Sequence, residues 1–252
     1  TIYRTLDEDH YALENTDKNS IISILKRLEK LYKGGVGLLQ YTIMNNHVHL
    51  ILSETQDFHL SNSEVKLRYE DFHIDKKSID ARSKFCARFG RRLNNISEFM
   101  KDLLWYSAVF FNNSRKLNER RRRGSLWNPR FRSCTLEGRN ALLKCSLYVA
   151  LNPVRAKMVK RAQDYKWSSR GEQKITGRHP HEDELRRFYS HTKFGDDCFD
   201  EIELLFQESL AEIEDVSQDK EKNEYSKEDA LFLCPNRAWN LSEKLKTSTN
   251  SL

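Results

Sequence analysis

The sequence has few cysteines and no long apolar run. Its five cysteines, Cys86, Cys134, Cys145, Cys198 and Cys234, are widely spaced, and no two form a CxxC pair. Without such a pair, neither a zinc site nor a disulfide framework is indicated, and we expect reduced thiols. No apolar run is long enough to cross a bilayer, and the first residues lack the basic and apolar segments of a signal peptide. We therefore expect a cytoplasmic protein with no membrane partner.

What the sequence has instead is length and charge. It contains 252 residues, with 43 Lys and Arg against 37 Asp and Glu, for a net charge of +6. Because domains usually comprise roughly 100–200 residues, this length predicts one substantial domain and an appendage. The positive balance suits a polyanionic partner such as a nucleic acid.

The spacing of apolar residues predicts a helix, a turn and a strand near the start of the chain. Residues 20–32 carry apolar side chains at helical spacing, and three glycines then interrupt the pattern. The apolar run over residues 38–52 predicts a strand with a kink or hairpin near Asn45 and Asn46, because this dipeptide is typical of turns.

Two further stretches follow the predicted strand. Residues 60–95 are crowded with charges and show patchy periodicity, which predicts an exposed helical insertion. From Asn95 the sequence Asn-Ile-Ser-Glu resembles a capping box, and a long helix to about residue 113 is expected. Its apolar stripe contains Phe99, Leu103, Tyr106 and Phe110.

The second half of the chain predicts more helices. An apolar helix is expected over residues 141–151, and Asn152 with Pro153 then predicts a restart, with Asn as the N-cap and Pro in the first turn. Beyond Trp167 the composition changes to an acidic helix and a polar, mobile tail. The apolar face of that helix comprises Phe199, Ile202, Leu205, Phe206, Leu210 and Ile213. We expect a domain over residues 1–170 and a helical extension over 171–252.

His47 and His49 are the first candidates for chemistry. In a strand, residues i and i+2 point to the same face, so the two imidazoles are expected side by side. Such a pair can hold a divalent ion. Taken alone, however, the pattern fits equally a pair of half-buried histidines on an amphipathic strand.

Three segments downstream add to the histidine strand. They are Gly124-Ser-Leu-Trp127-Asn-Pro-Arg130-Phe-Arg-Ser133, Tyr148-Val-Ala-Leu-Asn152-Pro-Val-Arg-Ala156 and Tyr165-Lys-Trp167-Ser-Ser169. Together with Tyr41-Thr-Ile-Met-Asn-Asn-His-Val-His-Leu-Ile-Leu52, they resemble the motifs of HUH transposases, of the single-tyrosine insertion-sequence and REP-associated kind. The resemblance covers residues 3 to 169 except for the charged insertion, and ordered motifs are more specific than one motif alone.

The resemblance implies a fold, a cofactor and a partner. The implied fold is α+β, a ferredoxin-like antiparallel sheet with helices on one face. His47 and His49 would bind Mg²⁺ or Mn²⁺ on a central strand, with Asn112 as a third ligand. The implied partner is single-stranded or hairpin DNA, which active members cut through a phosphotyrosine intermediate that conserves the bond energy. The family includes monomers and dimers, so a homodimer is one implied state.

The nucleophile is where this sequence departs from the family. The usual tyrosine position, seven residues after Met100 and five before Asn112, is Ser107, and Tyr106 is its neighbour. A shift of one residue rotates a helical side chain by about 100°. Tyr106 is therefore as well explained by core packing as by catalysis, and Asn112 equally by a helix C-terminal cap. Two functions stay open: a transposase that cuts and rejoins DNA, and a decayed relative that binds structured DNA.

Basic residues near the aromatics of the second motif are candidates for DNA contact. Guanidinium groups can bind phosphates, while Trp127 and Phe131 could stack on unpaired bases or anchor the core. The candidate DNA-binding residues are Arg120, Arg121, Arg122, Arg123, Arg130, Arg132 and Arg155.

Overall fold

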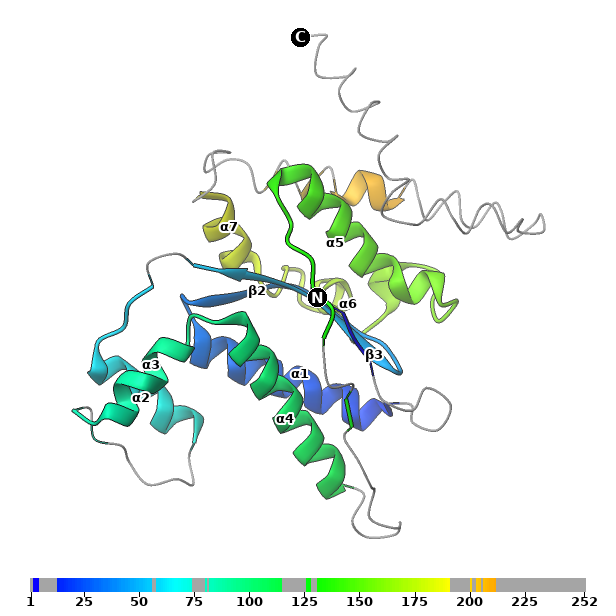
Figure 1. Cartoon of the computed structure of the whole chain (residues 1–252). Helices are drawn as coiled ribbons and strands as arrows, with labels where there is room; N and C mark the ends of the chain where they lie inside the picture. Colours follow the sequence, from blue (N-terminus) through cyan, green and yellow to red (C-terminus); the bar gives the residue numbers. More distant parts are fainter. Residues whose placement is uncertain are drawn as a thin grey trace, which may run out of the picture. The chain divides into compact units, whose positions relative to one another are not determined.

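The chain divides into two compact units in the computed structural model. Unit 1 comprises Thr1–Leu39 and Ile43–Arg132, and unit 2 comprises Gln40–Thr42 and Ser133–Leu252. The sequence had suggested a division near residue 170. Helices and strands are both present, as the predicted α+β class requires (Figure 1). The structure describes residues 2–4, 13–55, 58–73, 80, 82–114, 126–127, 131–190, 200, 203–204 and 206–211.

Unit 1 combines a three-stranded sheet with helices. The strand order is β1-β3-β2, and β1 pairs antiparallel with β3 so that Ile2 lies opposite His49. The elements are β1 (Ile2–Arg4), α1 (Asn15–Tyr32), β2 (Val36–Ile43), β3 (His47–Glu54), α2 (Asn62–Phe72), α3 (Lys84–Arg92) and α4 (Ile96–Ser114). Of β2, the residues Gln40–Thr42 are assigned to unit 2.

Strands β2 and β3 form a hairpin, which is one of the two alternatives that the sequence left open at Asn45 and Asn46. The backbone N–H of Met44 donates to the carbonyl of His47 at 2.8 Å, and that of Thr55 donates to the carbonyl of Gly35 at 2.9 Å. These bonds lie at the two ends of the pair, so the strands run antiparallel around a turn at Asn45. Every residue of β2 is buried, so apolar side chains occur on both faces of the strand, and the polar residues Gln40 and Thr42 are buried with them.

Helices α1 and α4 pack against each other in unit 1 (Figure 1). The Tyr32 hydroxyl donates to Asp102 Oδ2 at 2.8 Å, and Arg92 donates to the other carboxylate oxygen at 2.6 Å. Burial raises the pKa of the Tyr32 phenol, and the charge of Asp102 raises it further. The phenol therefore stays protonated and holds α1 to α4. The predicted start of α4 is confirmed, because Asn95 Oδ1 accepts from the backbone N–H of Glu98.

The charged insertion is helical and most of its residues are exposed or half-buried, but one face of each helix is buried. Helices α2 and α3 pack on each other, and the side chains of Val65, Tyr69 and Phe89 are buried. A Cβ on Gly90 would lie 2.9 Å from a methyl of Val65, so the close approach favours glycine there. Short helices need few apolar residues, and the many charges on their outer faces obscured the pattern.

Unit 2 is mostly helical, and its longest helix corrects a sequence prediction. The elements are α5 (Gly138–Arg155), the 3-10 turn η1 (Ala162–Asp164), α6 (Ser169–Thr176) and α7 (Glu182–Ser190). Helix α5 runs through Pro153 without the restart expected at Asn152. Because proline lacks an N–H, the carbonyl of Val149 loses its helical partner. Thr42 Oγ1 donates to that carbonyl at 2.9 Å instead, and Asn152 Nδ2 donates to the Tyr148 carbonyl at 2.7 Å.

The serines of the Tyr165–Ser169 motif have structural partners in unit 2. Ser168 Oγ accepts from the backbone N–H of Gly171 and caps α6, and Ser169 Oγ accepts from the backbone N–H of Tyr41 at 2.9 Å. A Cβ on Gly171 would lie 2.1 Å from the carbonyl oxygen of Tyr165, so this turn admits only glycine. These bonds account for the motif without a nucleophilic role for either serine.

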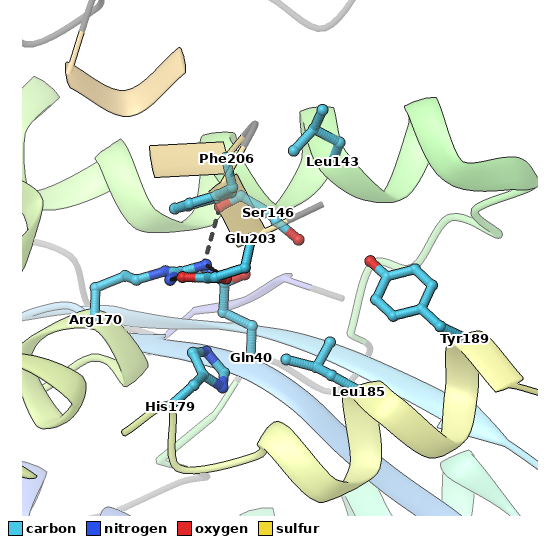
Figure 2. A pocket seen from close by; sticks show the side chains of 9 residues that line it. All are labelled: Gln40, Leu143, Ser146, Arg170, His179, Leu185, Tyr189, Glu203 and Phe206. Atoms are coloured by element: carbon cyan, nitrogen blue, oxygen red, sulfur yellow. Dashed lines mark hydrogen bonds and ion pairs between the residues drawn. The ribbon is translucent and has the colours of Figure 1, made fainter. Parts of the chain in front are cut away.

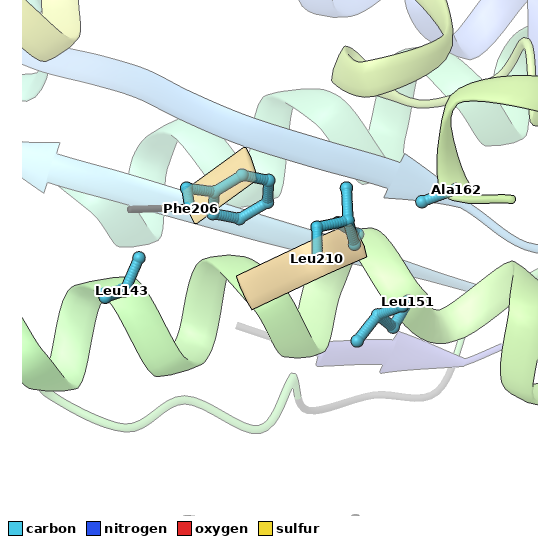
Figure 3. Close-up of a cluster of buried hydrophobic side chains, with 6 residues drawn as sticks. Leu143, Leu151, Ala162, Phe206 and Leu210 are labelled. Atoms are coloured by element: carbon cyan, nitrogen blue, oxygen red, sulfur yellow. The ribbon is translucent and has the colours of Figure 1, made fainter. Parts of the chain in front are cut away.

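A hydrophobic cluster fixes part of the expected C-terminal helix in unit 2 (Figure 3). Residues 203–204 and 206–211 are helical, and Phe206 and Leu210 are buried, as their spacing predicts. Phe199, Ile202, Leu205, Ile213 and the polar tail lie outside the described residues. The cluster also contains Leu143, Ala150, Leu151 and Ala162.

No helix of the described ranges combines the length and the apolar character needed to cross a bilayer. Cys86, Cys134 and Cys145 are free thiols, while Cys198 and Cys234 lie outside these ranges.

Candidate functional site

The two histidine rings lie next to each other at the start of β3. Their centroids are 4.7 Å apart, and the ring planes are nearly perpendicular at 84°. His47 is half-buried, whereas only 2% of His49 is exposed. This is the same-face arrangement expected for residues i and i+2 of a strand, with one ring nearer to solvent than the other.

A neighbouring amide fixes the tautomer of His47. Asn46 Oδ1 lies 2.6 Å from His47 Nδ1, and a carboxamide oxygen can only accept, so Nδ1 carries the proton. The lone pair is then on Nε2, the nitrogen a metal would bind. The turn itself is held by Lys18 Nζ, which donates to Asn45 Oδ1 at 2.6 Å. The arrangement fits two imidazole ligands for a divalent ion such as Mn²⁺.

Asn112, the third expected ligand, lies in the last turn of α4 with its side chain exposed. Across the described ranges, no three His, Cys, Asp or Glu side chains gather in a group that could hold a metal. Metal binding by the histidine pair, with Asn112 as a third ligand, therefore stays a prediction.

Ser107, the expected tyrosine position, points into the core of unit 1. Only 3% of the residue is exposed. Its hydroxyl donates to the Leu103 carbonyl at 2.7 Å and accepts from Trp127 Nε1 at 2.9 Å. A cavity of about 10 Å³ beside it, with Phe110, Phe111 and other side chains as walls, is too small for a phenol ring. Ser107 thus anchors a buried tryptophan.

Tyr106, the neighbour of Ser107, contacts the C-terminal end of α2 instead. Its ring lies 5.2 Å from that of Phe72, and its hydroxyl is 3.1 Å from His73 Nε2. His73 Nδ1 is 3.0 Å from the Tyr69 carbonyl and must donate to it, so Nε2 accepts the phenol proton. Burial raises the pKa of Tyr106, and the charge of Asp102 raises it further. The phenol is consequently protonated at neutral pH.

The predicted DNA contacts divide into three groups. Arg120–Arg123 and Arg130 lie outside the described residues. Arg132 is exposed, and the guanidinium of Arg155 lies 4.9 Å above the ring of Tyr148. Trp127 is buried and hydrogen-bonded, so it is a core anchor rather than a stacking platform, while Phe131 is half-buried.

One exposed aromatic residue escaped the sequence analysis. Trp105 on α4 is 58% exposed, and the side chain of Lys101, one turn earlier, is 73% exposed. The sequence signal was present, because Trp105 falls outside the buried stripe of α4 and an exposed tryptophan is uncommon. A surface ring beside a cation suits stacking on an unpaired base.

Comparison with known proteins found one relevant likeness. No family model matches the chain, and no curated protein matches it either. Among solved structures, it is similar to a REP-associated tyrosine transposase bound to a REP hairpin, with 14% sequence identity and a TM-score of 0.40. The match covers 71% of this chain and 80% of that chain.

Proposed function

We propose that this chain binds single-stranded or hairpin DNA and holds a Mg²⁺ or Mn²⁺ ion on His47 and His49. The observation that carries the proposal is the adjacent imidazole pair, in which Asn46 fixes the proton of His47 on Nδ1. A bound divalent ion would offset charge on the oxygens of a backbone phosphate. The net charge of +6 and the arginine-rich segment after α4 favour a polyanion as partner.

Binding without strand cleavage is the function that the nucleophile geometry supports best. The family position is occupied by Ser107, which is buried and hydrogen-bonded to Trp127. Cleavage by Tyr106 is the second candidate, and the contact with His73 favours it, because an imidazole that accepts the phenol proton is a suitable base.

A covalent-adduct assay separates these two candidates. With labelled hairpin DNA and Mn²⁺, we expect the wild type to bind the DNA and to form no covalent protein–DNA band. The reason is that the raised pKa of Tyr106 and its packing against Phe72 keep the phenol protonated and confined. An adduct that maps to Tyr106 and disappears in Tyr106→Phe would establish the second candidate instead, with DNA binding of both proteins confirmed first.

The metal site is tested by calorimetry with Mn²⁺. The double variant His47→Ala, His49→Ala should lose measurable Mn²⁺ binding, because both proposed nitrogen ligands are removed. The single variant Asn46→Ala should bind more weakly by about tenfold, since the partner that orients the ring is lost. The exposed His59→Ala is a matched control and should leave binding unchanged. Equal Mn²⁺ binding by the wild type and the double variant would show that His47 and His49 do not bind the ion.

The DNA contacts are tested through the salt dependence of binding. Replacing Arg120–Arg123 with alanine should flatten the slope of log affinity against log salt by roughly 0.7 for every phosphate that these arginines neutralise in the wild type. Arg178→Ala with Arg186→Ala is a matched control, because these exposed guanidinium groups are paired with Glu182. If the four-arginine variant keeps the wild-type slope, the arginine run does not bind phosphate.

A further inference from the structure

A buried arginine in unit 2 is unused by the proposed function. Arg170, in the first turn of α6, is only 5% exposed, and a buried guanidinium requires a partner. Its Nη1 donates to Glu203 Oε1, and its Nη2 donates to Oε2 at 3.2 Å (Figure 2). The guanidinium carbon also lies 3.7 Å from the centre of the Phe206 ring. The carboxylate is thus held by both arms of the guanidinium fork.

Other donors gather at the same carboxylate. Gln173, one turn along α6 from Arg170, donates from Nε2 to Glu203 Oε1 at 3.3 Å, while its own Oε1 accepts from Arg170 at 2.7 Å. Gln207 Nε2 also donates to Glu203 Oε1, at 2.6 Å. Arg170 and Gln173 therefore form a receptor on α6, and its acceptor comes from a segment 33 residues further along the chain.

The receptor continues into a cavity of about 20 Å³ that Arg170, His179 and Tyr189 help to line (Figure 2). His179 Nδ1 accepts from the backbone N–H of His181 at 3.2 Å, so the ring proton is on Nε2. Burial lowers the pKa of His179 to about 2, and the charge of Arg170 contributes, so the ring is neutral. Arg170 Nε and His179 Nε2 are buried donors with no partner among the described residues. The cavity thus offers donors beyond those that the carboxylate uses.

We propose that Arg170, Gln173 and His179 form a binding site for a phosphate group, which the carboxylate of Glu203 fills from within the chain. A guanidinium fork matches two oxygens of a phosphate as well as two of a carboxylate. A phosphate carries additional oxygens, which can reach the donors that Glu203 leaves unused. The ligand enters when the side chain of Glu203, which is 21% exposed, rotates away from Arg170 towards solvent, while Phe206 and Leu210 stay packed in the hydrophobic cluster. It is either a free phosphate ion or a DNA backbone phosphate, and the second source rests on the proposed function.

The test compares the wild-type chain with three variants in inorganic phosphate at constant ionic strength. Glu203→Gln removes the internal anion and should bind phosphate about tenfold more tightly than the wild type, because competition by the closed state is lost. Its melting temperature should rise with phosphate concentration, with sodium chloride as the comparison salt. Glu208→Gln removes one exposed carboxylate from the same segment and should behave as the wild type. The double variant Arg170→Gln, Glu203→Gln should not show the higher phosphate affinity of Glu203→Gln, because the guanidinium that binds the phosphate is removed.

If Glu203→Gln does not fold, Glu203→Asp is the second variant, because it keeps the charge and shortens the side chain. It should show a smaller gain in phosphate affinity than Glu203→Gln. Adding Gln173→Ala to Glu203→Asp should reduce that gain. A hairpin oligonucleotide in place of phosphate distinguishes the sources. Tighter oligonucleotide binding by Glu203→Gln, reversed by Arg170→Gln, assigns the site to the DNA backbone, and a gain for inorganic phosphate alone assigns it to the free ion. Equal phosphate affinity in the wild type and both Glu203 variants overturns the site, even where hairpin binding shows that the proposed function holds.

Discussion

Ser107→Tyr is expected to lower the free energy of unfolding by about 3 kcal/mol or more, and to form no covalent adduct with hairpin DNA. The added ring has to enter a core whose neighbouring cavity measures about 10 Å³. Overpacking of this kind typically costs about 1–3 kcal/mol. The substitution also removes the oxygen that accepts from Trp127 Nε1, and a buried donor left without a partner costs about 1–3 kcal/mol. Denaturation by urea measures the loss.

Ser107→Ala is the matched control, because it removes the same acceptor without adding volume. It should lose about 1–2 kcal/mol and keep the wild-type denaturant slope. A Ser107→Tyr protein as stable as the wild type, and able to form an adduct in Mn²⁺, would show that this helix position faces the DNA rather than the core. That result would also show that the wild type forms no adduct because Ser107 stands where a tyrosine is needed.

Lowering the pH should destabilise unit 2 through His179. Burial lowers its pKa to about 2, so below about pH 6.5 the unfolded chain binds a proton that the folded chain does not. The contribution of this residue is fully present above pH 6.5 and is lost as the pH falls towards 2. The expected loss is about 1.4 kcal/mol per pH unit, or roughly 3 kcal/mol at pH 4.5.

Chemical denaturation at pH 7 and pH 4.5 measures this effect. His179→Gln does not titrate and retains an oxygen that can accept from the backbone N–H of His181, so its stability should fall less between the two pH values. The exposed His59→Gln should keep the wild-type difference. If His179→Gln and the wild type lose the same free energy, His179 takes up a proton in the folded state.

Local periodicity made part of the fold predictable. The hairpin of β2 and β3 follows from one apolar run broken by two asparagines. Helix α4 follows from its cap at Asn95 and from Phe99 and Leu103, which are buried, whereas Phe110 of the expected stripe is 39% exposed. The adjacent rings of His47 and His49 follow from strand geometry alone. In each of these cases the deciding interaction joins residues close in sequence, so the local spacing of residue types is enough to predict it.

The remaining features depend on partners far away in sequence. Pro153 looked like a helix boundary because the hydroxyl that satisfies Val149 belongs to Thr42, 107 residues before it. The role of Ser107 became clear only from the indole of Trp127. No sequence pattern marks Arg170, because its partner Glu203 lies 33 residues further along the chain, in a stretch expected to form an acidic helix. The local spacing of residue types does not predict these contacts, because the two partners are far apart in the sequence.

The three residues Gln40–Thr42 make unit 2 discontinuous in sequence, and this limits how the chain can be dissected. Gln40 donates to the Ser146 carbonyl, Tyr41 to Ser169 Oγ and Thr42 to the Val149 carbonyl. A fragment that begins at Ser133 would retain all four of its main helical elements but lose these three donors. During synthesis, residues 40–42 leave the ribosome long before α5 does, so this part of the strand must stay available while more than ninety intervening residues are made. Unit 2 is therefore a structural unit but not a segment that a gene fragment could encode by itself.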